Sequence, residues 1–225
     1  MKIAVVGIGK TGIKVKELLE REGILYGAFD QEIMENPAAL NGANASIVFV
    51  PGAAAENLIP ILLNSKKPVI WAGTGYTFPE GFNDKLISLG TPWVYGSNYS
   101  LGMQIAMDMI KVLSERLSIL DNPQISLHEI HHIHKKDAPS GTALTWEELL
   151  KRDIDITSER IGDVVGTHQL TVETETETIY LEHKALDRGI FAQGAVWACK
   201  QVLKNVNNYK GLIPFSEIYR KNIEV

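Results

Sequence analysis

The sequence predicts an α/β protein with a doubly wound parallel sheet, followed by a second α+β domain with an open, mostly antiparallel or mixed sheet. Three observations lead to this prediction. Strand-like and helix-like segments alternate through the first hundred residues, and a glycine-rich turn follows the first strand. After residue 123 the chain changes to β-rich runs that are separated by acidic turns. Alternation indicates a parallel sheet with helices on both faces, and the later runs indicate a separate sheet.

The bulk composition limits the possible classes of protein. The 225 residues carry a formal net charge of −5, and 45% of them are hydrophobic. The negative charge argues against a general nucleic-acid-binding protein, because nothing compensates for phosphate repulsion. The sequence contains no run of about 18 apolar residues, so no membrane span is predicted. The single cysteine, Cys199, cannot form an internal disulfide, so we expect a cytoplasmic protein.

The first element is a short strand at residues 2–6, which runs into a glycine-rich turn and then an amphipathic helix pattern. The turn, residues 7–12, has the form G-x-G-x-x-G. In this context the glycines let the backbone approach a pyrophosphate, and the helix N-terminus favours its negative charge. A second strand ends at Asp30, 18 positions after Gly12, near the spacing at which a carboxylate binds the ribose of NAD. We therefore predict a Rossmann-like dinucleotide site. The alternative is a tight turn without a ligand.

The same segment does not fit a P-loop. That motif needs a glycine at the position that Ala4 occupies, inside the strand. We therefore exclude a nucleotide triphosphatase.

Strands at 45–50, 67–71 and 92–95 each end in a turn of small residues, and a helix is predicted at 56–63 after the first of them. The carboxyl ends of parallel strands meet at one edge of a sheet, where doubly wound proteins bind ligands. We expect these turns to share a crevice, although each is also explained as a simple turn. The predicted cofactor contacts are Gly7, Ile8, Gly9, Lys10, Thr11, Gly12, Asp30, Ala72, Gly73, Thr74, Gly96, Ser97, Asn98 and Tyr99.

The second half begins with a predicted helix at 101–117, in which apolar residues recur at three- and four-residue steps. Further predicted elements are a strand at 125–132, a helix at about 141–151, antiparallel strands at 164–172 and 178–183, and a helix from Phe191 to about Asn205. No regular element is predicted for the tail. The predicted domains are residues 1–100 with 194–225, for the dinucleotide, and 101–193.

The segment EIHHIHKKDAPSGTA, residues 129–143, has three possible interpretations: a metal site, a solvated basic patch or a catalytic loop. Neighbouring side chains of a strand point to opposite faces, so His132 and His134 can share a face that His131 cannot join. The lysines that follow repel a cation, and we predict no metal site. A basic patch does not explain the turn that comes next.

That turn is predicted to start a helix. Ser140 suits the N-cap, and Gly141 and Thr142 then have free backbone N–H groups that form an anion cradle. Lys135 adds a positive charge and a transferable proton, and histidine titrates near neutral pH. We therefore predict a pocket for an anionic acid next to a nicotinamide.

Residues 129–143 match E-x-H-H-x-x-K-x-D-A-P-S-G-T-A at every fixed position, and residues 97–102 are similar to N-[FY]-S-x-G. In these motifs the chain resembles the 4-hydroxy-tetrahydrodipicolinate (dihydrodipicolinate) reductase family over nearly its whole length. The resemblance implies hydride transfer from NAD(P)H to a small cyclic dicarboxylate in the diaminopimelate route of lysine biosynthesis. It also implies acid/base roles for His131 and Lys135. Substrate contacts are implied for His132, Ser140, Gly141 and Thr142.

The resemblance further implies a homotetramer that associates through the sheet of the second domain. The chain departs from the family pattern on the cofactor side: it is shorter between Asp30 and Ser46, its glycine turn lacks one residue, and Gln31 stands where the family has a basic residue. Asp30 repels a 2′-phosphate, whereas Lys10 tolerates one. We therefore expect NADH to be used at least as well as NADPH.

Two other classes of function remain open. One is a different NAD(P)-dependent dehydrogenase of the same build, for which no alternative catalytic motif is visible. The other is a non-catalytic redox sensor that binds the dinucleotide. A sensor would not need His131 and Lys135 beside an anion-binding turn.

Overall fold

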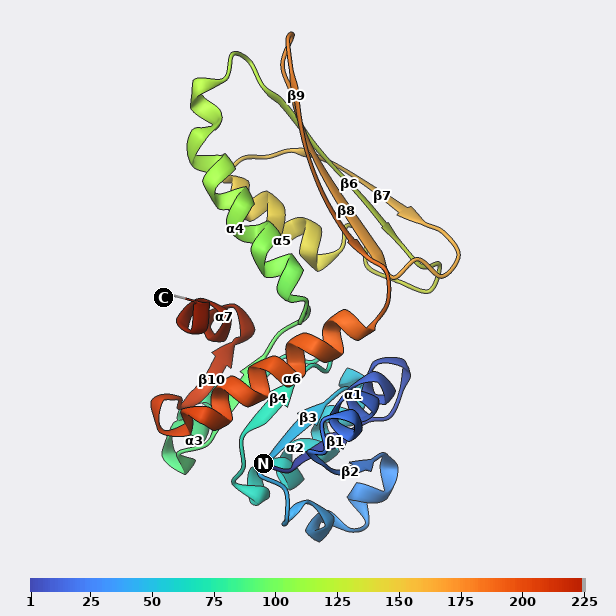
Figure 1. Cartoon of the computed structure of the whole chain (residues 1–225), viewed down its shortest axis with the longest axis vertical. Coiled ribbons are helices and arrows are strands. Elements are labelled where there is room, and N and C mark those ends of the chain that lie inside the picture. Colours follow the sequence, from blue (N-terminus) through green and yellow to red (C-terminus); the bar gives the residue numbers. More distant parts are fainter. Residues whose placement is uncertain (224–225) are drawn as a thin grey trace. The chain divides into compact units, whose positions relative to one another are not determined.

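The computed structural model describes residues 1–223, and its chain divides into two compact units (Figure 1). The first unit contains Met1–Ser100 and the segment from Arg188 onward, and the second contains Leu101–Asp187. The return to the first unit was expected at residue 194, which lies inside helix α6 (Gly189–Lys204). The change of unit therefore coincides with the start of a helix rather than with a position inside it.

The first unit is built on a six-stranded sheet with the order β10-β5-β4-β3-β1-β2. Every pair of neighbouring strands is parallel, which confirms the predicted doubly wound sheet. The central strands are buried along their whole length, as expected for a parallel sheet that is covered on both faces. The strands are β1 (Ile3–Val6), β2 (Leu25–Phe29), β3 (Ala45–Val48), β4 (Val69–Trp71), β5 (Pro92–Tyr95) and β10 (Gly211–Pro214).

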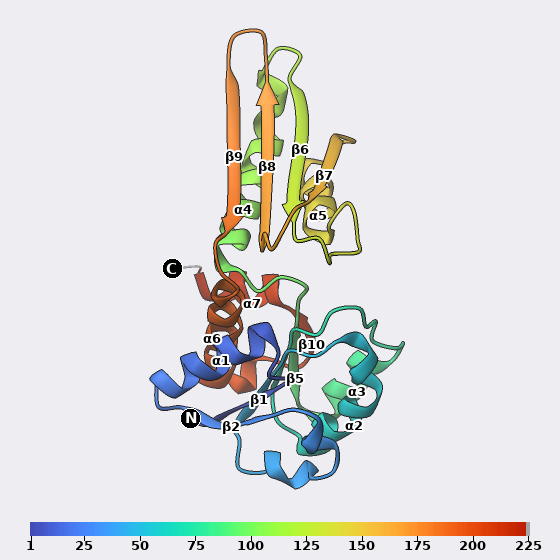
Figure 2. The same ribbon diagram turned by 90° about the vertical axis from the view of Figure 1, so that its right-hand side faces the viewer.

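Helices lie on both faces of this sheet. Figure 2 shows α1 and α6 on one face, and α2 and α3 on the other. The aromatic rings of Trp71 and Trp93 stack at 6.3 Å between their centroids in the core on the α2 side. The helices are α1 (Lys10–Arg21), α2 (Ala55–Ser65), α3 (Phe82–Leu89), α6 and α7 (Phe215–Ile223). The sequence did not predict α3, β10 or α7.

The shortened segment after Asp30 folds into two single turns of 3-10 helix, η1 (Gln31–Met34) and η2 (Pro37–Leu40). Ile33 and Leu40 from these turns are buried in the core. The two short 3-10 turns therefore cover this part of the core, at a place where the chain has no α-helix.

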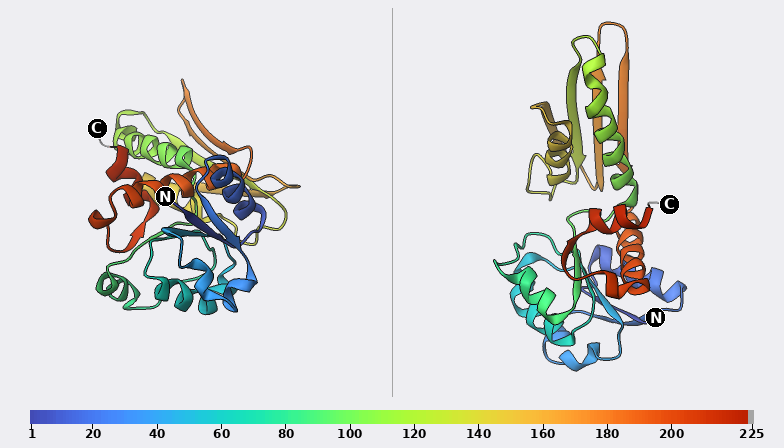
Figure 3. Two further views of the ribbon diagram at one scale, coloured as in Figure 1. Left: turned by 60° about the horizontal axis from the view of Figure 1, so that its bottom comes forward. Right: turned by 90° about the vertical axis from the view of Figure 1, so that its left-hand side faces the viewer.

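The second unit contains a four-stranded sheet with the order β7-β6-β8-β9. Strand β6 pairs in parallel with β7 and antiparallel with β8, and β8 pairs antiparallel with β9, so the sheet is mixed. The views of Figure 3 show helices α4 and α5 together on one face of this sheet. The elements are α4 (Leu101–Arg116), β6 (Gln124–His131), α5 (Gly141–Leu150), β7 (Asp155–Arg160), β8 (Gly166–Glu173) and β9 (Thr178–Ala185).

The covered face of the mixed sheet forms the core of the second unit. Met103, Ile110, Leu127, Trp146 and Leu170 meet there, each no more than 1% exposed. Strand alternation puts polar residues on the other face. Among residues 1–223, no helix combines the length and the apolar character that crossing a bilayer requires.

Candidate active site

Two acid/base groups share one face of strand β6. Glu129 and His131 are two residues apart, so their side chains point to the same side of the strand. Glu129 is fully buried and His131 is 8% exposed. The Nδ1 of His131 is hydrogen-bonded to Oε2 of Glu129. Because a carboxylate can only accept, Nδ1 carries the proton and Nε2 keeps a free lone pair.

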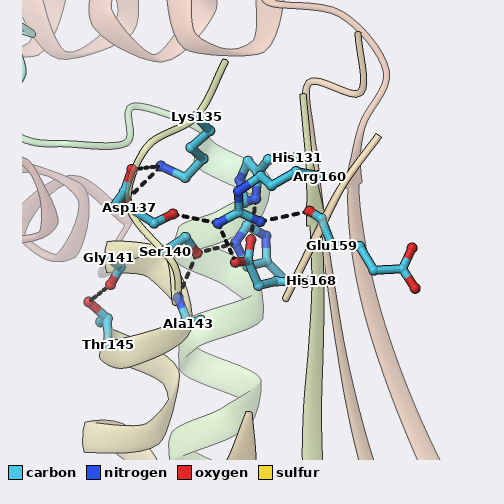
Figure 4. A network of polar contacts seen from close by, with 11 residues as sticks. His131, Lys135, Asp137, Ser140, Gly141, Ala143, Thr145, Glu159, Arg160 and His168 are labelled. Atoms are coloured by element: carbon cyan, nitrogen blue, oxygen red, sulfur yellow. Dashed lines mark hydrogen bonds and ion pairs between the residues drawn. The ribbon is translucent and has the colours of Figure 1, made fainter. Parts of the chain in front are cut away.

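Arg160 stands opposite His131 in the register of β6 and β7. Its NH2 group donates to Oε1 of Glu129 at 2.8 Å and to the backbone carbonyl of Asp137. Its NH1 group donates to the carbonyl of Glu159 at 2.7 Å. Figure 4 shows the guanidinium between the end of β7 and the loop that follows β6. The guanidinium therefore joins the buried carboxylate to that loop.

The loop after β6 holds Lys135 by a carboxylate. Nζ of Lys135 donates to both oxygens of Asp137, each at 2.8 Å. The Lys135 side chain is 23% exposed and that of Asp137 is 56% exposed. Figure 4 draws this pair beside the first turn of α5. A charged ammonium is thus kept at the surface of the second unit, close to a helix N-terminus.

The predicted start of α5 is confirmed. Ser140 is the N-cap, and its Oγ accepts a hydrogen bond from the N–H of Ala143 at 3.2 Å. The same Oγ lies 3.2 Å from Nε2 of His168. The serine hydroxyl has one proton and two lone pairs, so it can pair with either tautomer of the His168 ring. Ser140 therefore fixes both the helix start and the position of a buried histidine.

His168 lies on β8 below these groups and is 3% exposed. Its ring makes an edge contact with His131, with 5.1 Å between centroids, and lies 5.6 Å from Trp146. Burial lowers the pKa of His168 to about 3, and the charge of a protonated His131 would act in the same direction. His168 is therefore neutral at physiological pH.

The ring of His131 also packs against the backbone of Gly166. A Cβ atom at Gly166 would lie 3.0 Å from Nε2 of His131, closer than ordinary carbon contacts allow. A side chain here would push the imidazole away. The glycine therefore leaves space for the ring at the functional nitrogen.

Three groups of the site besides His168 have shifted pKa values. Burial lowers the pKa of His131, although the neighbouring Glu129 acts in the opposite direction. Burial alone would raise the pKa of Glu129, but hydrogen bonds from Arg160 and Ser158 outweigh it and the net pKa lies below the ordinary value. For Asp137, burial is likewise outweighed by the Lys135 hydrogen bond and by backbone N–H groups, including that of Gly141, so its pKa is lowered. At neutral pH the site thus combines a neutral imidazole, two carboxylates and two cations.

A metal-like cluster occurs in the second unit, and it contains only His131 of the three histidines that the sequence brought into question. Glu129, His131 and His168 offer ligand atoms that lie within 4.8 Å of one another. The carboxylate of Glu129 is already shared between His131 and Arg160. The direct hydrogen bond from His131 leaves no space for an ion between these two groups, so the cluster is better described as a hydrogen-bond network.

The sequence-predicted substrate residues lie around this network. His132 is half-buried and follows the end of β6, and His134 is exposed in the loop, with 6.3 Å between their ring centroids. Gly141 and Thr142 form the first turn of α5. The sequence argument assigned no role to four residues of the network: Glu129, Asp137, Arg160 and His168. For Glu129 a signal existed, because two-residue spacing on a strand places it beside His131.

The predicted dinucleotide turn has the expected form in the first unit. A Cβ atom at Gly12 would lie 1.8 Å from the carbonyl oxygen of Gly7, so only glycine allows this tight connection. Helix α1 begins directly after Gly9, and a Cβ atom at Gly9 would meet nothing within 4 Å. The space beside Gly9 is therefore open at the start of α1, which is the kind of helix N-terminus that favours an anion. Lys10 and Thr11 form the first turn of α1 and Ile8 lies in the connection.

The ends of β2, β3 and β4 supply further groups of this edge. Asp30 is exposed directly after β2, and its N–H donates to Oε1 of Glu32 at 2.9 Å. The turn after β3 contacts the turn after β4 through a bridge between Pro51 and Thr74. The structure therefore brings the turn that contains Ala72 and Gly73 next to the neighbouring strand end, as expected for a common ligand edge.

Tyr99 has a structural place in the first unit. Its side chain is 1% exposed, and its hydroxyl lies 3.0 Å from the backbone carbonyls of Trp71 and Val94. The side chain therefore ties the turn after β5 to the sheet. This turn also contains Gly96, Ser97 and Asn98, of which Gly96 and Asn98 are exposed and Ser97 is partly exposed.

Comparison with known proteins agrees with the motif. The family model described as "Dihydrodipicolinate reductase, C-terminus" matches residues 102–217, just over half of the chain. The 4-hydroxy-tetrahydrodipicolinate reductase of Methanospirillum hungatei is 34% identical over 68% of this chain and 67% of its own length. That of Bdellovibrio bacteriovorus is 29% identical over 91% of both chains.

Among solved structures, the fold is similar to "Dipicolinate bound Dihydrodipicolinate reductase from Paenisporosarcina sp. TG-14". The TM-score is 0.72 at 13% identity, over 95% of this chain and 97% of that one. At this identity the likeness concerns the fold. Together with the family match and the 34% identical relative, it leads to one conclusion: the chain belongs to the dihydrodipicolinate reductase family.

Proposed function

We propose that the protein catalyses the NAD(P)H-dependent reduction of 4-hydroxy-tetrahydrodipicolinate to tetrahydrodipicolinate, in the diaminopimelate route of lysine biosynthesis. Family membership supports this reaction. The observation that carries it is the loop from His131 to Thr142, in which a neutral imidazole, an ammonium and a helix N-terminus occur together. A cyclic dicarboxylate needs both an anion cradle and a proton source, and this loop offers both.

The proton chemistry belongs to Lys135 and His131. Reduction of a ring double bond conjugated to an imine requires a proton at the carbon that does not receive the hydride. Lys135, held by Asp137, gives that proton as an ammonium. His131 is neutral because burial lowers its pKa, and its Nε2 lone pair accepts a proton or a hydrogen bond from the substrate.

The substrate carboxylates would be bound at the start of α5. The N–H groups of Gly141 and Thr142 belong to the first turn, at the positive end of the helix dipole, where that of Gly141 already bonds the carboxylate of Asp137. Ser140 fixes this turn as the N-cap, and His132 would offer a ring nitrogen to the substrate from the same loop. These assignments make the first turn of α5 the specificity element for an anionic substrate.

The nicotinamide cofactor, which supplies the hydride when bound, would be held by residues 7–12 and by the turns after β4 and β5. The open α1 N-terminus behind Gly9 supports this assignment. Asp30 and Glu32 place two carboxylates at the end of β2, where the adenosine ribose would lie. Two negative charges disfavour a 2′-phosphate, and we propose that NADH is used at least as well as NADPH. The measurement is the ratio of kcat/KM for the two cofactors; a strong NADPH preference would contradict it.

The open face of the mixed sheet is proposed as the contact of a homotetramer. It is polar rather than apolar: Gln169 and Tyr180 both donate to Oε2 of Glu182, at 2.5 Å and 3.2 Å. A cytoplasmic location is proposed because the one cysteine, Cys199, is buried and unpaired within the chain.

The deciding experiment is an assay with freshly made substrate that follows loss of NADH absorbance at about 340 nm. The wild type is expected to turn over, and Lys135→Ala is expected to bind cofactor normally while kcat falls by roughly 100-fold or more. Lys136→Ala, the exposed neighbour in the same loop, is the matched control and should retain activity. Cofactor binding without turnover by the wild type would instead indicate a redox sensor.

A further inference from the structure

One guanidinium connects both proposed proton-transfer groups. From Arg160, one line of contacts runs through Oε1 of Glu129, at 2.8 Å, to Nδ1 of His131. A second line runs through the carbonyl of Asp137, whose carboxylate holds Nζ of Lys135 at 2.8 Å. Figure 4 shows Arg160 between these two arms. Arg160 donates directly to a group in each arm, and Lys135 also acts on His131 through its charge.

The fold determines where Arg160 stands. It is the last residue of β7, and the parallel register pairs it with His131 across the sheet. Its side chain is 19% exposed, and NH1 is fixed by the carbonyl of Glu159 at 2.7 Å. An arginine fork has several donors in one plane, which a lysine ammonium does not reproduce. The site therefore uses the geometry of arginine as well as its charge.

We propose that Arg160 is a positioning residue that holds His131 and Lys135 in one fixed arrangement for proton transfer. The proposal rests on the proposed function, because it states how the acid and base of that reaction are held. Arg160 itself transfers no proton. It orients the imidazole through Glu129, and it orients the ammonium through the backbone of Asp137.

The charged groups around Glu129 provide a way to test the proposal. This carboxylate is fully buried. Arg160 faces it from β7, His131 from its own strand and His168 from β8. Lys135 faces His131 from the loop. Without the guanidinium, burial dominates and the pKa of Glu129 rises. A protonated Glu129 donates to Nδ1 instead of accepting from it, so the proton of the neutral imidazole moves to Nε2.

The test compares Arg160→Met with Arg160→Lys, and uses Arg152→Met as the matched control because Arg152 is exposed in the same unit. We expect kcat of R160M to fall about 100-fold, within the roughly 100- to 10,000-fold contribution of a positioned acid or base. We expect kcat of R160K to fall about tenfold, because a displaced group of this kind loses up to about 100-fold. KM should change less than kcat in both variants, and R152M should match the wild type.

The pH profile distinguishes positioning from simple destabilisation. In the wild type Glu129 stays ionised across the neutral range, because its pKa is lowered. In R160M its pKa is raised, so kcat should fall as the pH drops through that raised value and recover at higher pH. Nitrogen-15 spectra of labelled histidines should show Nδ1–H on His131 in the wild type and Nε2–H in R160M. A His131→Gln variant identifies the signal.

The spectra also separate this proposal from the proposed function. If the wild type does not reduce the substrate, the proposed function fails. The His131 signal and the amide exchange of the 133–138 loop would still show whether Arg160 positions these groups. Unchanged kcat, pH profile and His131 signal in R160M would overturn the proposal. If R160M does not fold, the R160K variant provides the test. A wild-type kcat in R160K, together with unchanged hydrogen exchange of the loop amides, would also overturn the proposal.

Discussion

At the scale of single residues, the site depends on a histidine that is kept neutral. His168 is buried on β8, its Nε2 is hydrogen-bonded to the hydroxyl of Ser140, and its Nδ1 has no hydrogen-bond partner within residues 1–223. A protonated His168 would place a positive charge beside the neutral His131. The burial that lowers the pKa of His168 to about 3 prevents this at physiological pH.

This burial predicts a loss of stability in acid. The folded pKa of about 3 lies below the ordinary 6.5, so the unfolded chain binds a proton first as the pH falls. The contribution is complete above about pH 6.5 and is lost progressively between there and about pH 3. At pH 4.5 the loss is at most roughly 2 to 3 kcal/mol of the free energy of unfolding. Urea denaturation at pH 7 and pH 4.5 measures it.

His168→Gln should reduce that pH dependence, because glutamine can accept from Ser140 without titrating. The matched control is His134→Gln, since His134 is exposed in the loop. If H168Q retained the full wild-type slope of stability against pH, the buried histidine would not be its source.

Gly166 gives a second prediction at this scale. A Cβ atom 3.0 Å from Nε2 of His131 must displace the ring by a few tenths of an ångström. We expect Gly166→Ala to lower kcat by about tenfold, since misplacement of a reacting group by about 1 Å costs up to about 100-fold. KM and the melting temperature should change little. A wild-type kcat would show that the ring has room to move without consequence.

At the scale of elements, the start of α5 combines two stabilising contacts in Ser140. Loss of an N-cap hydroxyl costs about 1 kcal/mol. The buried Nε2 of His168 would also lose its hydrogen-bond partner, which costs a further 1 to 3 kcal/mol or so. We therefore expect Ser140→Ala to lower the free energy of unfolding by about 2 kcal/mol or more, measured by urea denaturation. Thr145→Ala is the control, because the Thr145 hydroxyl donates to the carbonyl of Gly141 in its own helix. An effect of T145A as large as that of S140A would contradict the double role of Ser140.

The elements that the sequence predicted are those with a clear apolar period. The parallel strands of the first unit and helices such as α4 (Leu101–Arg116) were found in this way. Strand β7 was missed because DITSER has one apolar residue and lies at the edge of its sheet. Strand β10 was missed because it passes into α7 at Pro214 and Phe215 without a turn between them.

The same distinction explains which site residues were predictable. His131, Lys135 and Ser140 are local to one loop, and the motif contains them all. Glu129 is local too, through the two-residue period of β6. Arg160 depends on the register between β6 and β7, whose connection includes the whole of α5. No local pattern encodes such a pairing, so the residue that joins the two arms was visible only in the folded chain.

At the scale of the whole molecule, the mixed sheet of the second unit has one face covered by α4 and α5 and one face that no other helix or strand of Leu101–Asp187 covers. A four-stranded sheet with one covered face is stable alone, and its open face here is polar enough to be in water. Its exposed side chains are nevertheless ordered by hydrogen bonds across β8 and β9, such as that from Gln169 to Glu182. A regular, hydrogen-bonded polar surface of this kind suits contact with an identical surface of a second chain.

The last prediction therefore concerns assembly. Thr171 lies near the middle of the open face, paired with Tyr180 on β9 and Ser126 on β6. Thr171→Arg would place like charges against each other at a symmetric contact, so we expect it to dissociate the proposed tetramer of 24.9 kDa chains into smaller species. Light scattering coupled to gel filtration measures the mass. Glu148→Arg, on the exposed side of α5, is the control and should retain the wild-type mass. A wild-type mass equal to that of one chain would refute the tetramer. A T171R mass equal to that of the wild-type tetramer would show that the contact lies on another face.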